Sequence, residues 1–204
     1  MSRIKPRVAD LPTLDRAAHR VYPTQFFDEL DTSVADTHLS MEHLDDVLQA
    51  IASISGITAV VEVEMVKTHV LHVGLESAPT WEELNRVFTP RERVSAVARS
   101  GADLLYWNIL LSRFGPFWTG YWNRFDRKQG RVVAKLVNQG DSEEWCRIRA
   151  HVTAAFSTFG LREVPSELLD SRLSWLDVRD SHGTAHQRDG RGPSIYDAFF
   201  SDVY

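Results

Sequence analysis

The stretch from Arg179 to Pro193 gathers residue types that perform acid–base chemistry or bind metal ions and anions. It has three glycines, no large apolar residue and these charged or titratable side chains: Arg179, Asp180, His182, His186, Arg188, Asp189 and Arg191. An enzyme site built by this loop would use one histidine as base and Arg188 or Arg191 to hold an anion. The two histidines have metal-ligand spacing only on a helix, which Gly183 disfavours. A partner contact and a non-catalytic surface loop are the alternatives.

Other candidate groups carry weaker signals. His69 and His72 flank a predicted hairpin turn, where a third histidine could complete a metal site, but ordinary strand-surface histidines are the favoured interpretation. Cys146 lies near the start of a predicted helix, which can lower a thiol pKa, yet no Cys/His signature surrounds it. The chain contains no nucleophile elbow, phosphate-binding loop, dinucleotide fingerprint or His-Glu-x-x-His motif. We therefore predict no catalytic residue, metal or cofactor, and favour a non-enzyme.

Acidic residues are concentrated in one segment. Val21–Val66 contains no Lys or Arg and carries a charge of −9, whereas the whole 204-residue chain carries −5. The nine acids are Asp28, Glu29, Asp31, Asp36, Glu42, Asp45, Asp46, Glu62 and Glu64. One interpretation is a set of solvated faces, because acids are common in first helical turns and at outward strand positions. The other is a negative surface that steers a basic protein partner toward this one.

An aromatic strand is predicted over 117–125. Because successive side chains of a strand point to opposite faces, Phe117, Tyr121 and Phe125 are expected on one face and Trp118 and Trp122 on the other. The two tryptophans need either a covering helix or a partner surface, and an uncovered strand would favour a homodimer or a docked subunit of a larger assembly. Nucleic acid is not an expected partner, because the net charge is negative and few arginines lie nearby.

Composition places broader limits on the chain. A single cysteine excludes an internal disulfide framework and multi-cysteine metal sites. No apolar run reaches the length of a membrane span, and no leader peptide is evident at the N-terminus. We expect a cytoplasmic protein that does not associate with membranes.

Apolar residues recur at helical spacing in some segments of the chain and at strand spacing in others, and this pattern predicts the elements that would position these residues. Helices are predicted over 41–55, 80–88, 89–100 and 141–159, with one or two helical turns over 165–169. A hairpin is predicted over 57–75, with an odd-length loop centred on Thr68, and an antiparallel meander over 104–111, 117–125 and 131–137. Further strands are predicted over 175–178 and 195–200, and residues 1–38 are expected to be a largely irregular arm.

These elements predict an α+β fold in a single domain over 1–204. An antiparallel sheet, made of the hairpin and the aromatic meander, is expected to be covered by helices on one face. No repeat or Gly/Ser linker divides the chain.

Two segments resemble small bacterial immunity proteins of polymorphic toxin systems. They are Leu111-Ser112-Arg113-Phe114-Gly115-Pro116-Phe117-Trp118-Thr119 and the tail Pro193-Ser194-Ile195-Tyr196-Asp197-Ala198-Phe199-Phe200-Ser201-Asp202, together 19 of the 204 residues. Such proteins bind a toxin encoded beside them and protect the producing cell. The resemblance implies a cytoplasmic binding protein but transfers no binding residue.

We therefore predict a non-enzymatic binding protein that neutralises a basic toxin domain by direct contact. The nine acids, with Trp118 and Trp122, are the predicted contact residues. The alternatives are an enzyme whose site is the loop 179–193 and a structural subunit that docks through its aromatic strand.

Overall fold

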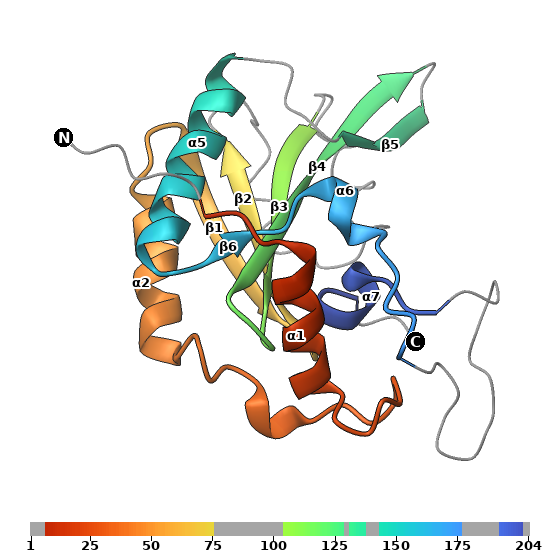
Figure 1. Ribbon diagram of the computed structural model, residues 1–204. Helices are drawn as coiled ribbons and strands as arrows, with labels where there is room; N and C mark the ends of the chain where they lie inside the picture. The colour runs from red at the N-terminus through yellow and green to blue at the C-terminus, as the bar shows by residue number, and fades with distance from the viewer. Residues whose placement is uncertain (1–6, 76–103, 129–130, 138–142, 177–191, 202–204) are drawn as a thin grey trace.

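A computed structural model of the protein describes residues 7–75, 104–128, 131–137, 143–176 and 192–201 (Figure 1). Its helices are α1 (Leu11–Val21), the 3-10 helix η1 (Thr32–Val34), α2 (Met41–Ala52), α5 (Glu143–Thr158), α6 (Ser166–Leu169) and α7 (Ile195–Phe199). Its strands are β1 (Ile57–Glu64), β2 (Thr68–Leu75), β3 (Leu104–Ser112), β4 (Phe117–Lys128), β5 (Arg131–Val137) and β6 (Arg162–Glu163). The helices predicted over 80–88 and 89–100 lie outside the described residues.

The strands form one sheet in the order β1-β2-β3-β4-β5, and every neighbouring pair on this path is antiparallel. The short strand β6 pairs in parallel with the first residues of β4. Consecutive strands are therefore neighbours in space, as the predicted hairpin and meander require. The α+β class and the antiparallel sheet are confirmed.

The register of the β1–β2 hairpin differs from the predicted one. The predicted pairs were Met65–Leu71, Val63–Val73 and Val61–Leu75, whereas the observed pairs include Glu64–His69, Val63–Val70 and Glu62–Leu71. The odd-length loop is therefore wrong. Opposite residues of an antiparallel pair share a face, so Glu62 and Glu64 lie on the face that also carries Leu71. That face offers them the tertiary partners described below.

Helices α2 and α5 cover one face of the sheet, and indole rings form much of the core there. Trp107 stacks on Trp122, which stacks on Trp145 of α5, with ring centroids 5.1 Å apart in both pairs. Trp118 meets Phe156 of α5 edge to face at 4.9 Å. Trp118 and Trp122 are 1% and 2% exposed. Of the two alternatives for this face, the covering helix is the one observed.

The burial of Trp118 and Trp122 corrects their assignment as partner-binding residues. A side chain packed beneath α5 has no surface left for another protein. The same burial removes the reason for expecting a homodimer, or docking to a larger assembly, through the aromatic strand.

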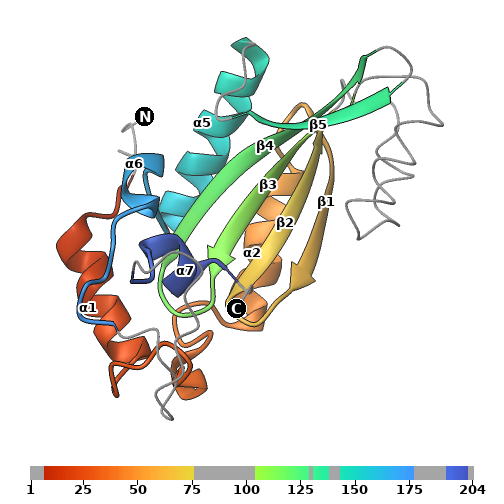
Figure 2. The ribbon, with the colours of Figure 1, turned by 90° about the vertical axis from the view of Figure 1, so that its right-hand side faces the viewer.

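The opposite face of the sheet also packs against helices, which α1 and α7 provide (Figure 2). Leu110 and Phe117 lie in a second core cluster with Leu14 of α1 and Phe199 of α7. The ring centroids of Phe117 and Phe199 are 5.3 Å apart. The expectation of helices on one face is therefore incomplete, because alternate residues of β3 and β4 are buried in two different clusters.

The N-terminal arm is more regular than predicted. Helix α1 begins after Asp10, whose carboxylate accepts a hydrogen bond from the amide of Thr13 at 2.8 Å. Pro12 lies in the first turn, where its missing amide hydrogen has no cost. An aspartate followed by an early proline is a local helix-start signal, and it was present in the sequence.

The strand predicted over 195–200 is instead helix α7. Ser194 and Asp197 form a reciprocal capping box, in which the Ser194 amide donates to Asp197 Oδ2 at 2.8 Å. The aromatic and branched residues of this segment favour a strand, but the local cap outweighs that preference. The strand predicted over 175–178 is also absent from its described residues, since Trp175 lies in a turn and stacks on His19.

Candidate functional site

The nine acids of the first third do not form one uniform surface. Asp28, Glu42, Asp45, Asp46 and Glu64 are exposed, and Glu29, Asp31, Asp36 and Glu62 are half-buried. Four of the nine have a defined structural contact: Asp31, Asp36, Glu62 and Glu64. The predicted acidic surface is thus smaller than the sequence indicated.

Three acids share the outer face of α2. Ser40 caps the helix by accepting from the amide of His43 at 3.3 Å, and Leu44, Val47 and Ile51 are buried against the sheet. Glu42, Asp45 and Asp46 are three and four positions apart and are all exposed. Residues at this spacing are neighbours on one helix face. The three carboxylates therefore form a negative surface on the solvent-exposed face of α2, beside the positive end of the helix dipole.

Asp31 has a local structural role. Its carboxylate accepts hydrogen bonds from the hydroxyl of Ser33 at 2.6 Å and the amide of Ser33 at 3.0 Å, and it caps η1. These side-chain and backbone hydrogen bonds hold the pKa of Asp31 below its ordinary value. The carboxylate is therefore part of the turn that leads toward Asp36.

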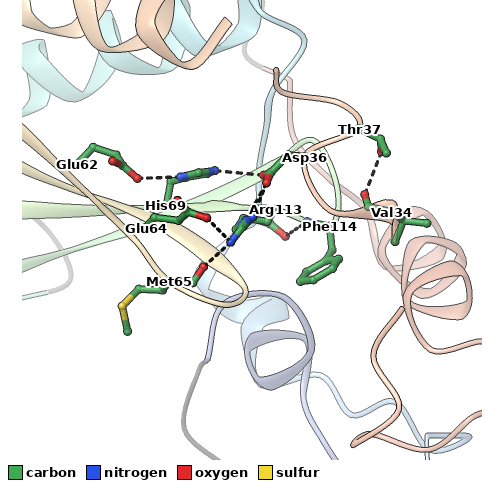
Figure 3. Close-up of polar contacts among 10 residues, drawn as sticks. Val34, Asp36, Thr37, Glu62, Glu64, Met65, His69, Arg113 and Phe114 are labelled. Carbon is green, nitrogen blue, oxygen red and sulfur yellow. Dashed lines mark hydrogen bonds and ion pairs between the residues drawn. The ribbon is translucent and has the colours of Figure 1, made fainter. Parts of the chain in front are cut away.

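Asp36 and Arg113 are the centre of a polar cluster between the segment before α2 and the sheet (Figure 3). Arg113 Nε and Nη2 donate to Asp36 Oδ2 at 2.9 and 2.6 Å. Arg113 Nη1 donates to the carbonyl of Met65 at 2.9 Å and lies 2.7 Å from Glu64 Oε1. The guanidinium therefore ties two carboxylates and the hairpin turn to the end of β3. We call Asp36, Glu62, Glu64, His69 and Arg113 the Asp36 cluster.

Asp36 keeps its charge in this setting. Burial raises the pKa of Asp36, but the hydrogen bonds and charges of Arg113 and His69 outweigh burial, so the pKa lies below its ordinary value of 3.8. Its backbone has a φ of 56°, in the left-handed region that only a few non-glycine residues adopt. Aspartate is among the residues that tolerate this conformation best, which suits it to both the turn and the ion pair.

His69 lies in the interior, although surface histidines were expected beside the turn. Its side chain is 2% exposed, with Nδ1 2.8 Å from Glu62 Oε1 and Nε2 3.1 Å from Asp36 Oδ1. His72 is half-buried and its Nδ1 lies 2.6 Å from Asn108 Oδ1. The expectation for His69 is wrong because the segment before α2 folds over the end of the hairpin and covers the ring.

His38 adjoins the same cluster. Burial lowers the pKa of His38, while its hydrogen bond to the backbone of Ser112 and the charge of Asp36 raise it less. Its Nε2 is buried without a hydrogen-bond partner among the described residues. Both features favour a neutral ring, because a neutral imidazole has one nitrogen without hydrogen.

Lys67 is a buried cation that sequence reasoning did not identify. Its side chain is 1% exposed, and Nζ donates to the carbonyl of Asp197 at 2.9 Å and lies 4.1 Å from the ring centroid of Phe27. A carbonyl and an aromatic face compensate part of the cost of removing an ammonium group from water. Lys67 therefore connects the hairpin with α7 and the segment after α1.

The chemistry available to the Asp36 cluster is structural. Both nitrogens of His69 face carboxylates, so neither is available to accept a proton from a substrate. Within the described ranges, no three His, Cys, Asp or Glu side chains are arranged to hold a metal ion. The cluster fixes the segment before α2 against the sheet.

The remaining sequence candidates divide into two groups. Residues 177–191, with His182, His186, Arg188 and Arg191, lie outside the described residues, so the enzyme alternative has no structural test. Cys146 is exposed near the start of α5.

In the described part of the chain, no helix is long and apolar enough to span a membrane.

Comparisons with protein-family models, curated protein sequences and solved structures gave no significant match.

Proposed function

We propose that this protein is a non-enzymatic binding protein that engages a basic protein partner through the outer face of α2. The observation that carries the proposal is the shared exposure of Glu42, Asp45 and Asp46 on one helix face. The segment Val21–Val66 has no Lys or Arg to neutralise them locally. A concentrated negative surface accelerates encounter with a positive one and disfavours acidic partners.

The three acids of the Asp36 cluster are not part of this surface. Asp36 and Glu62 are bound to Arg113 or His69, and Glu64 is paired with Arg113. The contact residues that we propose are therefore Glu42, Asp45 and Asp46, with Asp28 as a further exposed acid of the same segment. We infer a toxin domain as the partner, since the resemblance to immunity proteins suggests one and a basic toxin would complement this charge.

Co-purification with the product of the adjacent gene tests the proposal. The affinity-tagged protein should retain that product, and Asp45→Lys/Asp46→Lys should lose it. The matched control is Glu167→Lys/Asp170→Lys, which reverses one exposed acid of α6 and the exposed acid at its C-cap and should retain the product. Retention by the α2 variant would contradict the proposed surface. No co-purification with the wild-type protein would contradict the proposed partner.

A further inference from the structure

Two neighbouring apolar side chains are exposed at the turn of the β1–β2 hairpin. Met65 and Val66 are 42% and 51% exposed. Hairpin turns are usually made of glycine, asparagine or aspartate, because these residues suit the backbone of a tight turn. Neither turn geometry nor the core accounts for the two side chains, since both remain in contact with water. A contact outside the fold would remove this apolar surface from water.

The turn that presents these side chains is held firmly by hydrogen bonds. The amide of Met65 donates to the carbonyl of Thr68 at 2.8 Å, and Arg113 donates to the carbonyls of Met65 and Lys67, at 2.9 Å in each case. The side chain of Lys67 donates to a carbonyl of α7. Figure 3 shows the Met65 side chain pointing away from the Asp36 cluster, while its carbonyl faces Arg113. The turn is therefore ordered before a partner binds, which lowers the entropy lost on binding.

The exposed charges beside the turn are acidic. Glu64 precedes the turn and is exposed, although it is paired with Arg113. Asp28 is also exposed, and the phenylalanine before it packs against the side chain of Lys67. Lys67 itself is buried, and the segment Val21–Val66 contains no Lys or Arg. An apolar projection flanked by acids complements an apolar pocket with a basic rim.

The turn lies at the same end of the sheet as the start of α2. Arg113 connects the carbonyl of Met65 with the carboxylate of Asp36, and α2 begins five residues after Asp36. Figures 1 and 2 both show the hairpin turn and the first turn of α2 at this end. A typical interface covers about 800 Å² on each protein, which is far more than three carboxylates provide. A partner bound to the acids of α2 can therefore also contact the turn.

We propose that Met65 and Val66 are an apolar anchor that inserts into a pocket on the basic protein partner. The inference rests on the proposed function for the nature of the partner, and it adds a contact that the acidic face of α2 does not supply. Exposed charges mainly accelerate the encounter of two proteins, whereas buried apolar side chains contribute much of the affinity. The anchor therefore slows dissociation of a complex whose formation α2 accelerates.

Binding of the purified product of the adjacent gene, measured by titration calorimetry, tests the anchor. Met65→Ser/Val66→Ser should reduce the affinity at least about tenfold, and by the same factor at low and high salt, because salt does not screen an apolar contact. The melting temperature should not change, since both side chains are exposed. The matched control is Val8→Ser/Leu11→Ser, which removes two other exposed apolar side chains and should bind like the wild type.

A conservative variant separates an apolar contact from an effect on the shape of the turn. Met65→Leu/Val66→Ile keeps two apolar side chains on the same backbone. It should retain most of the affinity that the serine variant loses. Equal losses of affinity in the conservative and serine variants would overturn an apolar anchor.

Comparison with the α2 variant distinguishes the anchor from the proposed surface. Wild-type affinity of the serine variant, with loss of binding by Asp45→Lys/Asp46→Lys, would overturn the anchor and leave the proposed function intact. The reverse pattern would overturn the α2 surface and support the anchor. We expect both variants to bind more weakly. A wild-type protein that does not bind the product would overturn the proposed partner and the anchor with it.

Discussion

Asp36 and Arg113 hold each other by both side chain and backbone, although 77 positions separate them. Arg113 donates two hydrogen bonds to Asp36 Oδ2, and the amide of Asp36 donates to the carbonyl of Arg113 at 2.6 Å. The pair fixes the segment that leads into α2 to the end of β3. Helix α2, whose outer face we propose as the partner surface, begins at Met41, five residues after Asp36.

Replacing Arg113 should therefore destabilise the fold. Arg113→Met leaves the half-buried carboxylate of Asp36 without its cation, and we expect a loss of about 2 kcal/mol in the free energy of unfolding. Urea denaturation measures it. The control is Arg172→Met, which breaks a longer pair with Asp197, 3.8 Å, in which both side chains are more exposed, and it should change the value by less than about 1 kcal/mol. Similar losses in both variants would contradict a special role for Arg113.

The contribution of Asp36 should depend on pH. Its pKa is lower in the folded protein than its ordinary value of 3.8, because Arg113 and His69 outweigh the opposing effect of burial. A carboxylate with a lowered pKa stabilises the fold above its unfolded pKa, and this stabilisation is lost as the pH falls through the folded pKa. The stability difference between wild type and Asp36→Asn should shrink between about pH 5 and pH 2. A difference that grows on acidification would contradict this assignment.

Gly120 is required by the stacked tryptophans. A Cβ at this position would lie 2.6 Å from Trp107 Nε1 and 3.0 Å from the carbonyl oxygen of Asn108. Gly120→Ala should lower the free energy of unfolding by about 1–3 kcal/mol and weaken the near-ultraviolet circular dichroism of the indoles. In the control Gly192→Ala, the nearest atom would be 3.5 Å away, and stability should change little. Equal tolerance at both positions would contradict the close packing.

The cap of α7 can be tested independently. Ser194→Ala removes the hydroxyl that accepts from the Asp197 amide and should lower the free energy of unfolding by about 1 kcal/mol. Ser166→Ala is the comparison, since Ser166 is exposed on α6 and that helix has no side-chain cap. Thermal denaturation of both variants distinguishes a capped helix from the strand first expected here.

Local signals predicted the elements that local interactions stabilise. Ser40 and the apolar spacing after it predicted α2. The continuous apolar run 104–111, the aromatic segment 117–125 and the turns around them predicted β3, β4 and β5. The signals at Asp10 and Ser194 were equally local, and they could have identified α1 and α7. Local signals for most of the described helices and strands were therefore present in the sequence.

The hairpin register and the Asp36 cluster depend on distant residues. Alternation favoured placing Glu64 on a solvated face, but the observed register gives it Arg113, and gives Glu62 a contact with His69. No spacing rule connects positions so far apart in the chain. Likewise, nothing in the charge of the segment Val21–Val66 distinguished the acids of the Asp36 cluster from those on the outer face of α2.

Binding of the adjacent gene's product, measured by titration calorimetry at low and high salt, tests the central claim most directly. The wild-type protein should bind more weakly at high salt, because ions screen exposed charges. Asp45→Lys/Asp46→Lys should reduce the affinity at low salt by at least about tenfold, with an unchanged melting temperature. Affinity that is insensitive to both salt and these substitutions would contradict the acidic surface of α2 as the binding site.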